Sequence, residues 1–187
     1  MKRVRWVGLC LCVGCASAPL SEGPAAGGAT GSQPPAAVRP APQIVEVTNA
    51  REPLAGVTTG GKPTEAQLRR AQELGYRTVI SLLPEGDMAG EAEAVQALGM
   101  KFVSIPITDA NDLTEENARR LAVALDAPDE KPVLLHCASG NRAGALLALK
   151  AFYVDSATAA EAVELGTRAG MTSLRPQVEA KLEEAAR

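Results

Sequence analysis

The sequence has little histidine, cysteine or positive charge, and each shortage excludes a class of function. Its one histidine, His136, excludes a metal site built on several imidazoles, and a Ser-His-Asp triad would have to use it as the base. Basic residues number 19 against 22 acidic ones, and Lys2, Arg3 and Arg5 lie within the first five positions. Because the rest of the chain is clearly acidic, it would repel phosphate backbones, and we expect no nucleic-acid partner.

Residues 1–15 have the pattern of an export signal. Basic residues precede an apolar run that is far shorter than the roughly 20 residues of a membrane-spanning helix, and small residues follow. The Val-Gly-Cys sequence that ends at Cys15 resembles the lipobox of bacterial lipoproteins, with Cys12 in the place where leucine is usual. We therefore predict a lipidated Cys15 and a membrane-anchored protein of the bacterial cell envelope that faces the periplasm. The alternative is an ordinary signal peptide cut near Ala16 or Ala18.

The rest of the chain divides into a linker and one domain. Residues 16–43 are rich in Ala, Gly, Pro and Ser and predict a flexible tether. The domain, residues 44–187, contains a single cysteine, Cys137, so no disulfide can form within it. A free thiol in an exported protein, where disulfides form readily, needs a functional reason.

Strand and helix patterns alternate along the domain. Such alternation predicts an α/β fold with a mainly parallel central sheet that is flanked by helices. The expected strands are residues 44–47, 77–82, 101–107 and 131–136. The expected helices are residues 64–74, 91–98, 114–126, 143–154, a helix that Thr158 caps, and residues 174–186.

Residues 136–142 join the last predicted strand to the helix that follows. The backbone N–H groups of such a loop point inward and the helix dipole adds positive charge, so the loop can bind an anion. A thiol at a helix N-terminus beside a cation ionises readily, and we expect Cys137 to be a nucleophilic thiolate. Arg142 can bind two oxygens of an oxyanion at once, and Gly140 permits the torsions that turn the amides inward.

This segment resembles the signature of cysteine-dependent protein tyrosine and dual-specificity phosphatases, which is His-Cys, a loop with glycine, and Arg at the start of a helix. More narrowly, most of residues 44–154 is similar to the bacterial phosphatase-like domain that is also attached to β-lactamase-hydrolase-like proteins. Residues 59–68 are similar to that family's opening Ser-Gly-Gln-Pro-Thr segment, and residues 78–82 and 105–107 to its next strands. The resemblance implies a fold like that of dual-specificity phosphatases.

The resemblance also implies a role for each residue of the loop. Cys137 would take up the phosphoryl group, Arg142 would clamp the phosphate, and His136 would help to keep the thiolate ionised. The protein would then hydrolyse phosphomonoesters, protein phosphotyrosine among them, through a phosphocysteine and without a metal or other cofactor. Its partner would be a phosphorylated protein or small molecule. The amides that would hold the equatorial oxygens are those of Ala138, Ser139, Gly140 and Asn141, and the side chains of Ser139 and Asn141 can brace the loop.

A phosphatase of this kind also needs a general acid to protonate the leaving oxygen. In the family that the sequence resembles, this is an Asp on the loop after the strand that precedes the cysteine strand. Asp109 and Asp112 both lie there, and we prefer Asp109 because it is nearer the strand end, whereas Asp112 can help Thr114 to cap the next helix. Asp87 is a more distant candidate that fits a turn.

Two departures from the phosphatase pattern keep other functions open. Four residues separate Cys137 from Arg142, whereas tyrosine phosphatases have five. Four is the common spacing in rhodanese-type sulfurtransferases, whose cysteine carries a persulfide. Ala143 stands where the phosphatases usually place Ser or Thr to ease the departure of the thiol. The alternatives are therefore a rhodanese-like sulfurtransferase and an anion-binding module without catalysis.

Overall fold

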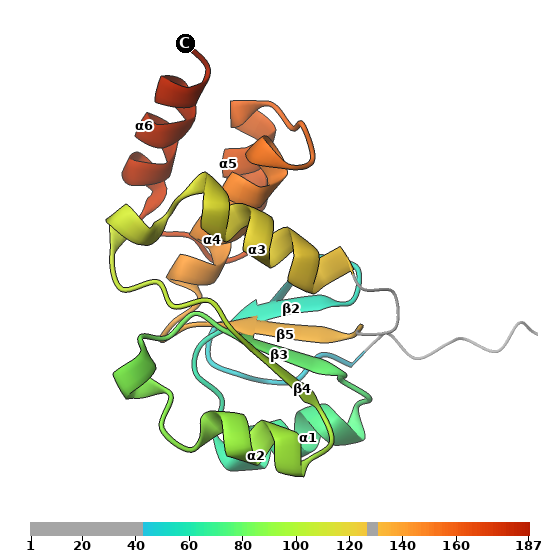
Figure 1. Cartoon of the computed structure of the whole chain (residues 1–187). Helices are drawn as coiled ribbons and strands as arrows, with labels where there is room; N and C mark the ends of the chain where they lie inside the picture. Colours follow the sequence, from blue (N-terminus) through green and yellow to red (C-terminus); the bar gives the residue numbers. More distant parts are fainter. Residues whose placement is uncertain (1–42, 127–130) are drawn as a thin grey trace, which may run out of the picture. The chain divides into compact units, whose positions relative to one another are not determined.

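The structure, a computed structural model, describes residues 43–126 and 131–187. Its five strands form one sheet in the order β1-β2-β5-β3-β4 (Figure 1). Neighbouring strands run parallel except β1 and β2, which are antiparallel. The predicted α/β fold with a mainly parallel central sheet is confirmed. The strands are β1 (Arg51–Leu54), β2 (Val57–Gly60), β3 (Thr78–Ser81), β4 (Lys101–Ser104) and β5 (Val133–His136).

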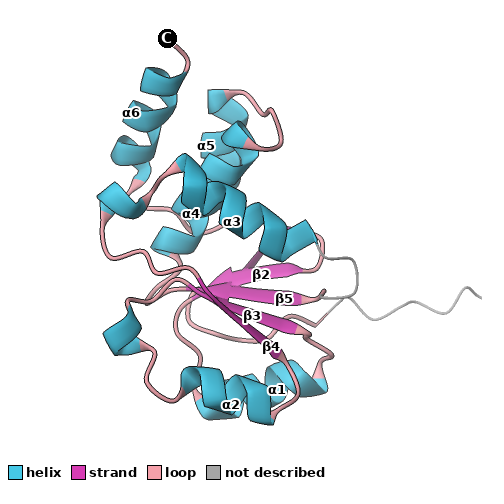
Figure 2. Ribbon diagram, in the orientation of Figure 1, coloured by secondary structure: helices cyan, strands magenta, loops and turns pink. Residues whose placement is uncertain are grey.

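Helices cover both faces of the sheet. Figure 2 shows α1 and α2 on one side, with α3 and α4 on the other and α5 and α6 beyond α4. The predicted helices are all present, and Thr64 and Thr158 form the expected capping boxes at the starts of α1 and α5. The helices are α1 (Glu65–Glu73), α2 (Glu91–Ala97), α3 (Glu115–Asp126), α4 (Asn141–Tyr153), α5 (Ala159–Arg168) and α6 (Arg175–Ala185), with short 3-10 helices η1 (Glu85–Asp87) and η2 (Ala110–Asp112).

The predicted signal peptide, residues 1–15, lies outside the described residues. So does the predicted linker, residues 16–43, apart from its last residue. Export and the lipidation of Cys15 therefore stay predictions. Within the described part of the chain, none of the helices combines the length and the apolar character that crossing a membrane requires.

The sheet separates two apolar clusters. Val79 and Leu134 point toward α1 and α2, while Ile80 and Leu135 point toward α3 and α4. Every residue of α4 from 143 to 151 is buried, so the segment that is apolar nearly all round is indeed a central helix. A Cβ atom at Gly144 would lie 2.6 Å from the Gly166 carbonyl oxygen. The backbones of α4 and α5 therefore touch, which fixes the N-terminal turn of α4.

The predicted first strand, residues 44–47, is wrong. Val45 and Val47 are buried as expected, but the Val45 amide donates to the Tyr76 hydroxyl (3.2 Å) and not to a neighbouring strand. The sheet instead begins with the β1–β2 hairpin. Its inner strand contains two buried threonines that obscured the apolar pattern, and one of them, Thr59, donates to the Ala169 carbonyl oxygen at 2.9 Å.

The predicted strand at residues 101–107 is also shorter than expected, because β4 ends at Ser104. Ile105 and Ile107 are buried, and their amides donate to the carbonyl oxygens of Ser81 (3.0 Å) and Leu82 (3.2 Å). Residues 105–107 thus continue along the end of β3 without regular pairing. This places the loop that follows, with Asp109, at the carboxyl edge of the sheet.

Candidate active site

Cys137 directly follows β5 at the carboxyl edge of the parallel strands, and α4 begins four residues later. Gly140 caps α4 in the left-handed conformation (φ 95°), which a residue with a side chain rarely adopts. Its N–H donates to the sulfur of Cys137 (3.1 Å), which is 1% exposed. The loop therefore turns a backbone amide onto the sulfur of the predicted nucleophile.

The cysteine loop, residues 137–140, packs on the backbone of two glycines at the end of β2. The Cys137 amide donates to the Gly60 carbonyl oxygen (3.2 Å), and Gly61 pairs with Ser139 in an isolated antiparallel bridge. A Cβ atom at Gly61 would lie 3.0 Å from the Ala138 carbonyl oxygen. The glycines thus allow a close approach that larger residues would block. In the sequence alone, only the family resemblance indicated that these two glycines matter.

Arg142 crosses from α4 to the loops that follow β3 and β4. Its Nη1 donates to the carbonyl oxygens of Leu82 (3.4 Å) and Ile107. Within residues 43–126 and 131–187, its Nε and Nη2 have no hydrogen-bond partner. That edge of the guanidinium can therefore bind two oxygens of an oxyanion at the same edge of the sheet as Cys137.

The polar side chains around the cysteine loop differ in part from expectation. Asn141 accepts from the Thr172 amide (2.7 Å) and donates to the Ser173 hydroxyl (2.7 Å), so it joins α4 to the loop before α6. The side chain that braces the cysteine loop is Asn49, which donates to the Ser139 carbonyl oxygen (3.0 Å). Asn49 was missed because nothing in the sequence links it to a segment 90 residues away. Ala138 and Ser139 are exposed, so the loop is accessible from solvent.

His136 and Glu91 form a buried pair behind the cysteine. The His136 Nε2 lies 2.8 Å from Glu91 Oε1, and the Ser81 hydroxyl donates to Glu91 Oε2 (3.2 Å). Glu91 was missed as a site residue, because in the sequence it marks only the start of a predicted helix. A signal was available, because Glu91 lies four residues before the buried Val95, on the helix face that turns inward.

The two candidate general acids have different surroundings. Asp112 accepts from the amides of Thr108 (2.6 Å) and Asp109 (3.4 Å), and these hydrogen bonds lower the pKa of Asp112. It is thereby kept ionised, which does not suit a proton donor. Asp109 is the cap of η2, and the Asp112 carboxylate completes that capping box through the Asp109 amide. Thr114 caps α3 through the Asn117 amide (3.2 Å), and Asp112 helps there through its carbonyl oxygen, which accepts from the Asn117 side chain (2.8 Å).

Asp109 is exposed and accepts one hydrogen bond, from the Asn111 amide (2.6 Å). It lies two residues after Ile107, whose carbonyl oxygen accepts from Arg142. Asp87 lies in the short turn η1, as expected. The Lys62 Nζ donates to its backbone carbonyl oxygen (2.5 Å) and not to its carboxylate. Asp109 therefore stays the preferred candidate for the acid. In the part of the chain that the structure describes, no cluster of His, Cys, Asp and Glu could hold a metal ion.

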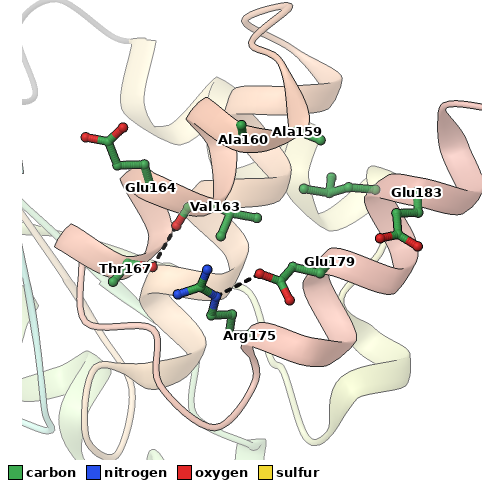
Figure 3. A pocket seen from close by; sticks show the side chains of 9 residues that line it. Ala159, Ala160, Val163, Glu164, Thr167, Arg175, Glu179 and Glu183 are labelled. Carbon is green, nitrogen blue, oxygen red and sulfur yellow. Dashed lines mark hydrogen bonds and ion pairs between the residues drawn. The ribbon is translucent and has the colours of Figure 1, made fainter.

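A separate pocket of about 490 Å³ lies between α5 and α6 (Figure 3). On the α6 side, Arg175 Nε donates to Glu179 Oε1 (2.7 Å), and on the α5 side the Thr167 hydroxyl donates to the Val163 carbonyl oxygen (2.8 Å). None of the cysteine-loop residues lines this pocket. It is therefore not the site that holds Cys137.

Comparison with known proteins supplies the family. Residues 41–185 match the family model PTP-NADK, described as a DSP-PTPase phosphatase fused to NAD+ kinase. The chain belongs to this family. It is thus a protein-tyrosine-phosphatase-like phosphoric monoester hydrolase, as the sequence analysis predicted. No curated protein sequence matches the chain.

Solved structures of phosphatases share the fold. A putative phosphatase (DUF442) from Shewanella putrefaciens CN-32 has a TM-score of 0.58 and 21% identity over 74% of this chain and 93% of that one. TpbA from P. aeruginosa, solved with phosphotyrosine, has a TM-score of 0.56 and 22% identity over 74% and 85%. The core catalytic domain of the PP-IP phosphatase SIW14 from S. cerevisiae has a TM-score of 0.54 and 15% identity over 77% and 94%. These similarities confirm the predicted resemblance to dual-specificity phosphatases in fold.

Proposed function

We propose that the protein hydrolyses phosphomonoesters through a phosphocysteine on Cys137. The observation that carries this proposal is the amide of Gly140 on the Cys137 sulfur, in a loop that leads into α4. Amides that converge at a helix N-terminus stabilise both a thiolate and the oxygens of a phosphoryl group. The family model and the neighbours named above are phosphatases and give no support to a sulfurtransferase.

In the first step, the Cys137 thiolate attacks phosphorus and the bond from phosphorus to the ester oxygen breaks. Asp109 gives its proton to the leaving alkoxide or phenoxide. Arg142, through Nε and Nη2, binds two of the non-bridging oxygens and offsets their charge. We assign the acid role to Asp109 because the amides of Thr108 and Asp109 keep Asp112 ionised.

In the second step, water attacks the phosphocysteine. Asp109, now a carboxylate, accepts a proton from the water, the P–S bond breaks, and inorganic phosphate leaves with the thiolate restored. Ala143, the first residue after Arg142, carries no hydroxyl that could assist the departing sulfur. We therefore expect this step to be slow relative to the first.

The substrate is proposed to be a phosphorylated small molecule or protein. The loops that follow the parallel strands, residues 61–64, 82–90, 105–114 and 137–140, contain no aromatic residue. A phosphotyrosine ring would thus find no aromatic side chain to stack on in these loops. Export and membrane anchoring through Cys15 remain part of the proposal, and metabolic labelling with a fatty acid, compared between the wild type and Cys15→Ala, tests them.

The test compares wild-type full-length chain with Cys137→Ser. Both are assayed under reducing conditions for hydrolysis of p-nitrophenyl phosphate and for sulfur transfer from thiosulfate to cyanide. The proposal predicts phosphate release that the variant loses and no thiocyanate. Thiocyanate without phosphate release would mean that the four-residue loop carries a persulfide, and the proposal would be wrong.

A further inference from the structure

Glu91 is the only carboxylate in the buried core of the residues that the structure describes. Its side chain is 4% exposed and that of His136 is 0% exposed. Glutamate is seldom buried unless it is paired, because removing a charge from water is costly. An apolar pair of similar volume would pack there at lower cost, so packing alone does not explain the presence of Glu91.

The carboxylate of Glu91 lies against the imidazole. One oxygen accepts from the Ser81 hydroxyl (3.2 Å), and the other lies 2.8 Å from His136 Nε2 without the alignment of a hydrogen bond. Ser81 on β3 is in register with His136 on β5, so the sheet brings these two side chains to the same carboxylate. The His136 carbonyl oxygen accepts from the Leu82 amide (2.9 Å), and the next amide, that of Cys137, is held by Gly60 (3.2 Å). The main chain is thus held on both sides, and the ring has the carboxylate as its charged neighbour.

The charges near His136 can be named element by element. Its side chain lies against one titratable group, Glu91 from α2, whose other oxygen accepts from the neutral Ser81 hydroxyl of β3. On the β2 side, the neighbouring main chain is that of Gly60, which carries no charge. From α4 comes the Arg142 guanidinium, which donates to the carbonyl oxygen of Leu82. Glu91 is therefore the anion whose charge a protonated His136 would balance.

We propose that Glu91 is a positioning residue that acts on Cys137 through His136. Its carboxylate, 2.8 Å from Nε2, supplies the counter-charge for an imidazolium directly before the nucleophile. A cation at that position stabilises the thiolate. The proposal rests on the nucleophilic role of Cys137 that the proposed function assigns.

The experiment measures the rate at which iodoacetamide alkylates Cys137 as a function of pH in the full-length chain. Glu91→Gln keeps a hydrogen-bonding side chain but removes the charge, and it should raise the midpoint of the alkylation profile by about one pH unit. Below both midpoints, this means alkylation that is about tenfold slower. The matched control is Glu93→Gln, which removes an exposed carboxylate from the same helix turn and should leave the profile unchanged. An unchanged or lowered midpoint in Glu91→Gln would overturn the proposal.

Three further variants separate a positioning role from a structural one. If Glu91 acts through His136, Glu91→Gln combined with His136→Gln should have the same midpoint as His136→Gln alone, whereas additive shifts would refute the proposal. If thermal unfolding shows that Glu91→Gln does not fold, Glu91→Asp replaces it as the test variant. Glu91→Asp keeps the charge, so the midpoint of its alkylation profile should be closer to that of wild type than to that of His136→Gln. A midpoint equal to that of His136→Gln would overturn the proposal. Alkylation does not require turnover, so a failure of phosphatase activity would be distinguishable from a failure of this inference.

Discussion

Replacing Gly61 by alanine should damage the cysteine loop and the stability of the fold together. The new Cβ atom would lie 2.9 Å from the Thr48 Cβ and 3.0 Å from the Ala138 carbonyl oxygen, and both distances are shorter than ordinary van der Waals contacts. Relief requires movement of backbone, because one of the two atoms belongs to the cysteine loop itself. Overpacking of this kind destabilises a protein by about 1 to 3 kcal/mol. For a chain of this size, that lowers the Tm by about 2 to 12 °C.

The assay for Gly61→Ala combines thermal unfolding with hydrolysis of p-nitrophenyl phosphate. A shift of the Ala138 carbonyl by a few tenths of an ångström moves the amides around Cys137, and we expect kcat/KM to fall about tenfold or more. Gly86→Ala is the matched control, because a Cβ atom there meets nothing within 4 Å, and its Tm should stay near that of wild type. A Gly61→Ala variant with wild-type Tm and activity would refute the close packing of the loop on β2.

Three other predictions concern charged side chains at the site. Arg142→Lys should lower kcat/KM by about a hundredfold with little change in Tm, because lysine cannot bind two oxygens from a planar fork; an effect under threefold would contradict the clamp. Asp109→Asn should lower kcat about a hundredfold or more for esters with poor leaving groups, whereas Asp112→Asn should not. A larger loss of kcat in Asp112→Asn than in Asp109→Asn would mean that Asp112 is the general acid. The amides of Thr108 and Asp109 lower the pKa of Asp112 in the folded protein. The ionised carboxylate therefore stabilises the fold. This contribution is complete above the pKa that Asp112 has in the unfolded chain and is lost as the pH falls through its pKa in the folded protein. Thermal unfolding from pH 6 to pH 3 should therefore show a smaller loss of Tm in Asp112→Asn than in wild type.

The sequence predicted best where a local pattern determines a structure by itself. The capping boxes at Thr64 and Thr158 mark the starts of α1 and α5 because each is complete within four residues. The turn from β5 into α4 was also predictable, since an apolar strand runs directly into Cys137 and Gly140 follows three residues later. The site is thus recognisable wherever its parts are consecutive.

The features that were missed depend on contacts between distant segments. The β1–β2 hairpin was not predicted because the threonines of β2 are buried against partners such as Ala169, 110 residues away, that no local pattern reveals. Glu91 was missed for the same reason, since its partner lies on a strand 45 positions later in the chain. Local periodicity carries no information about which distant polar groups will pair. Such pairs hold the β1–β2 hairpin in place and bring Glu91 to His136.

The central claim is that Cys137 carries the phosphoryl group during hydrolysis. Rapid acid quenching of the full-length chain during turnover of p-nitrophenyl phosphate, followed by mass spectrometry of the peptide that contains Cys137, tests it most directly. The account predicts a phosphorylated Cys137 in the wild type, at higher occupancy if the second step is slow, and none in Cys137→Ser. Steady phosphate release with no modified Cys137, or with the phosphoryl group on another residue, would contradict it.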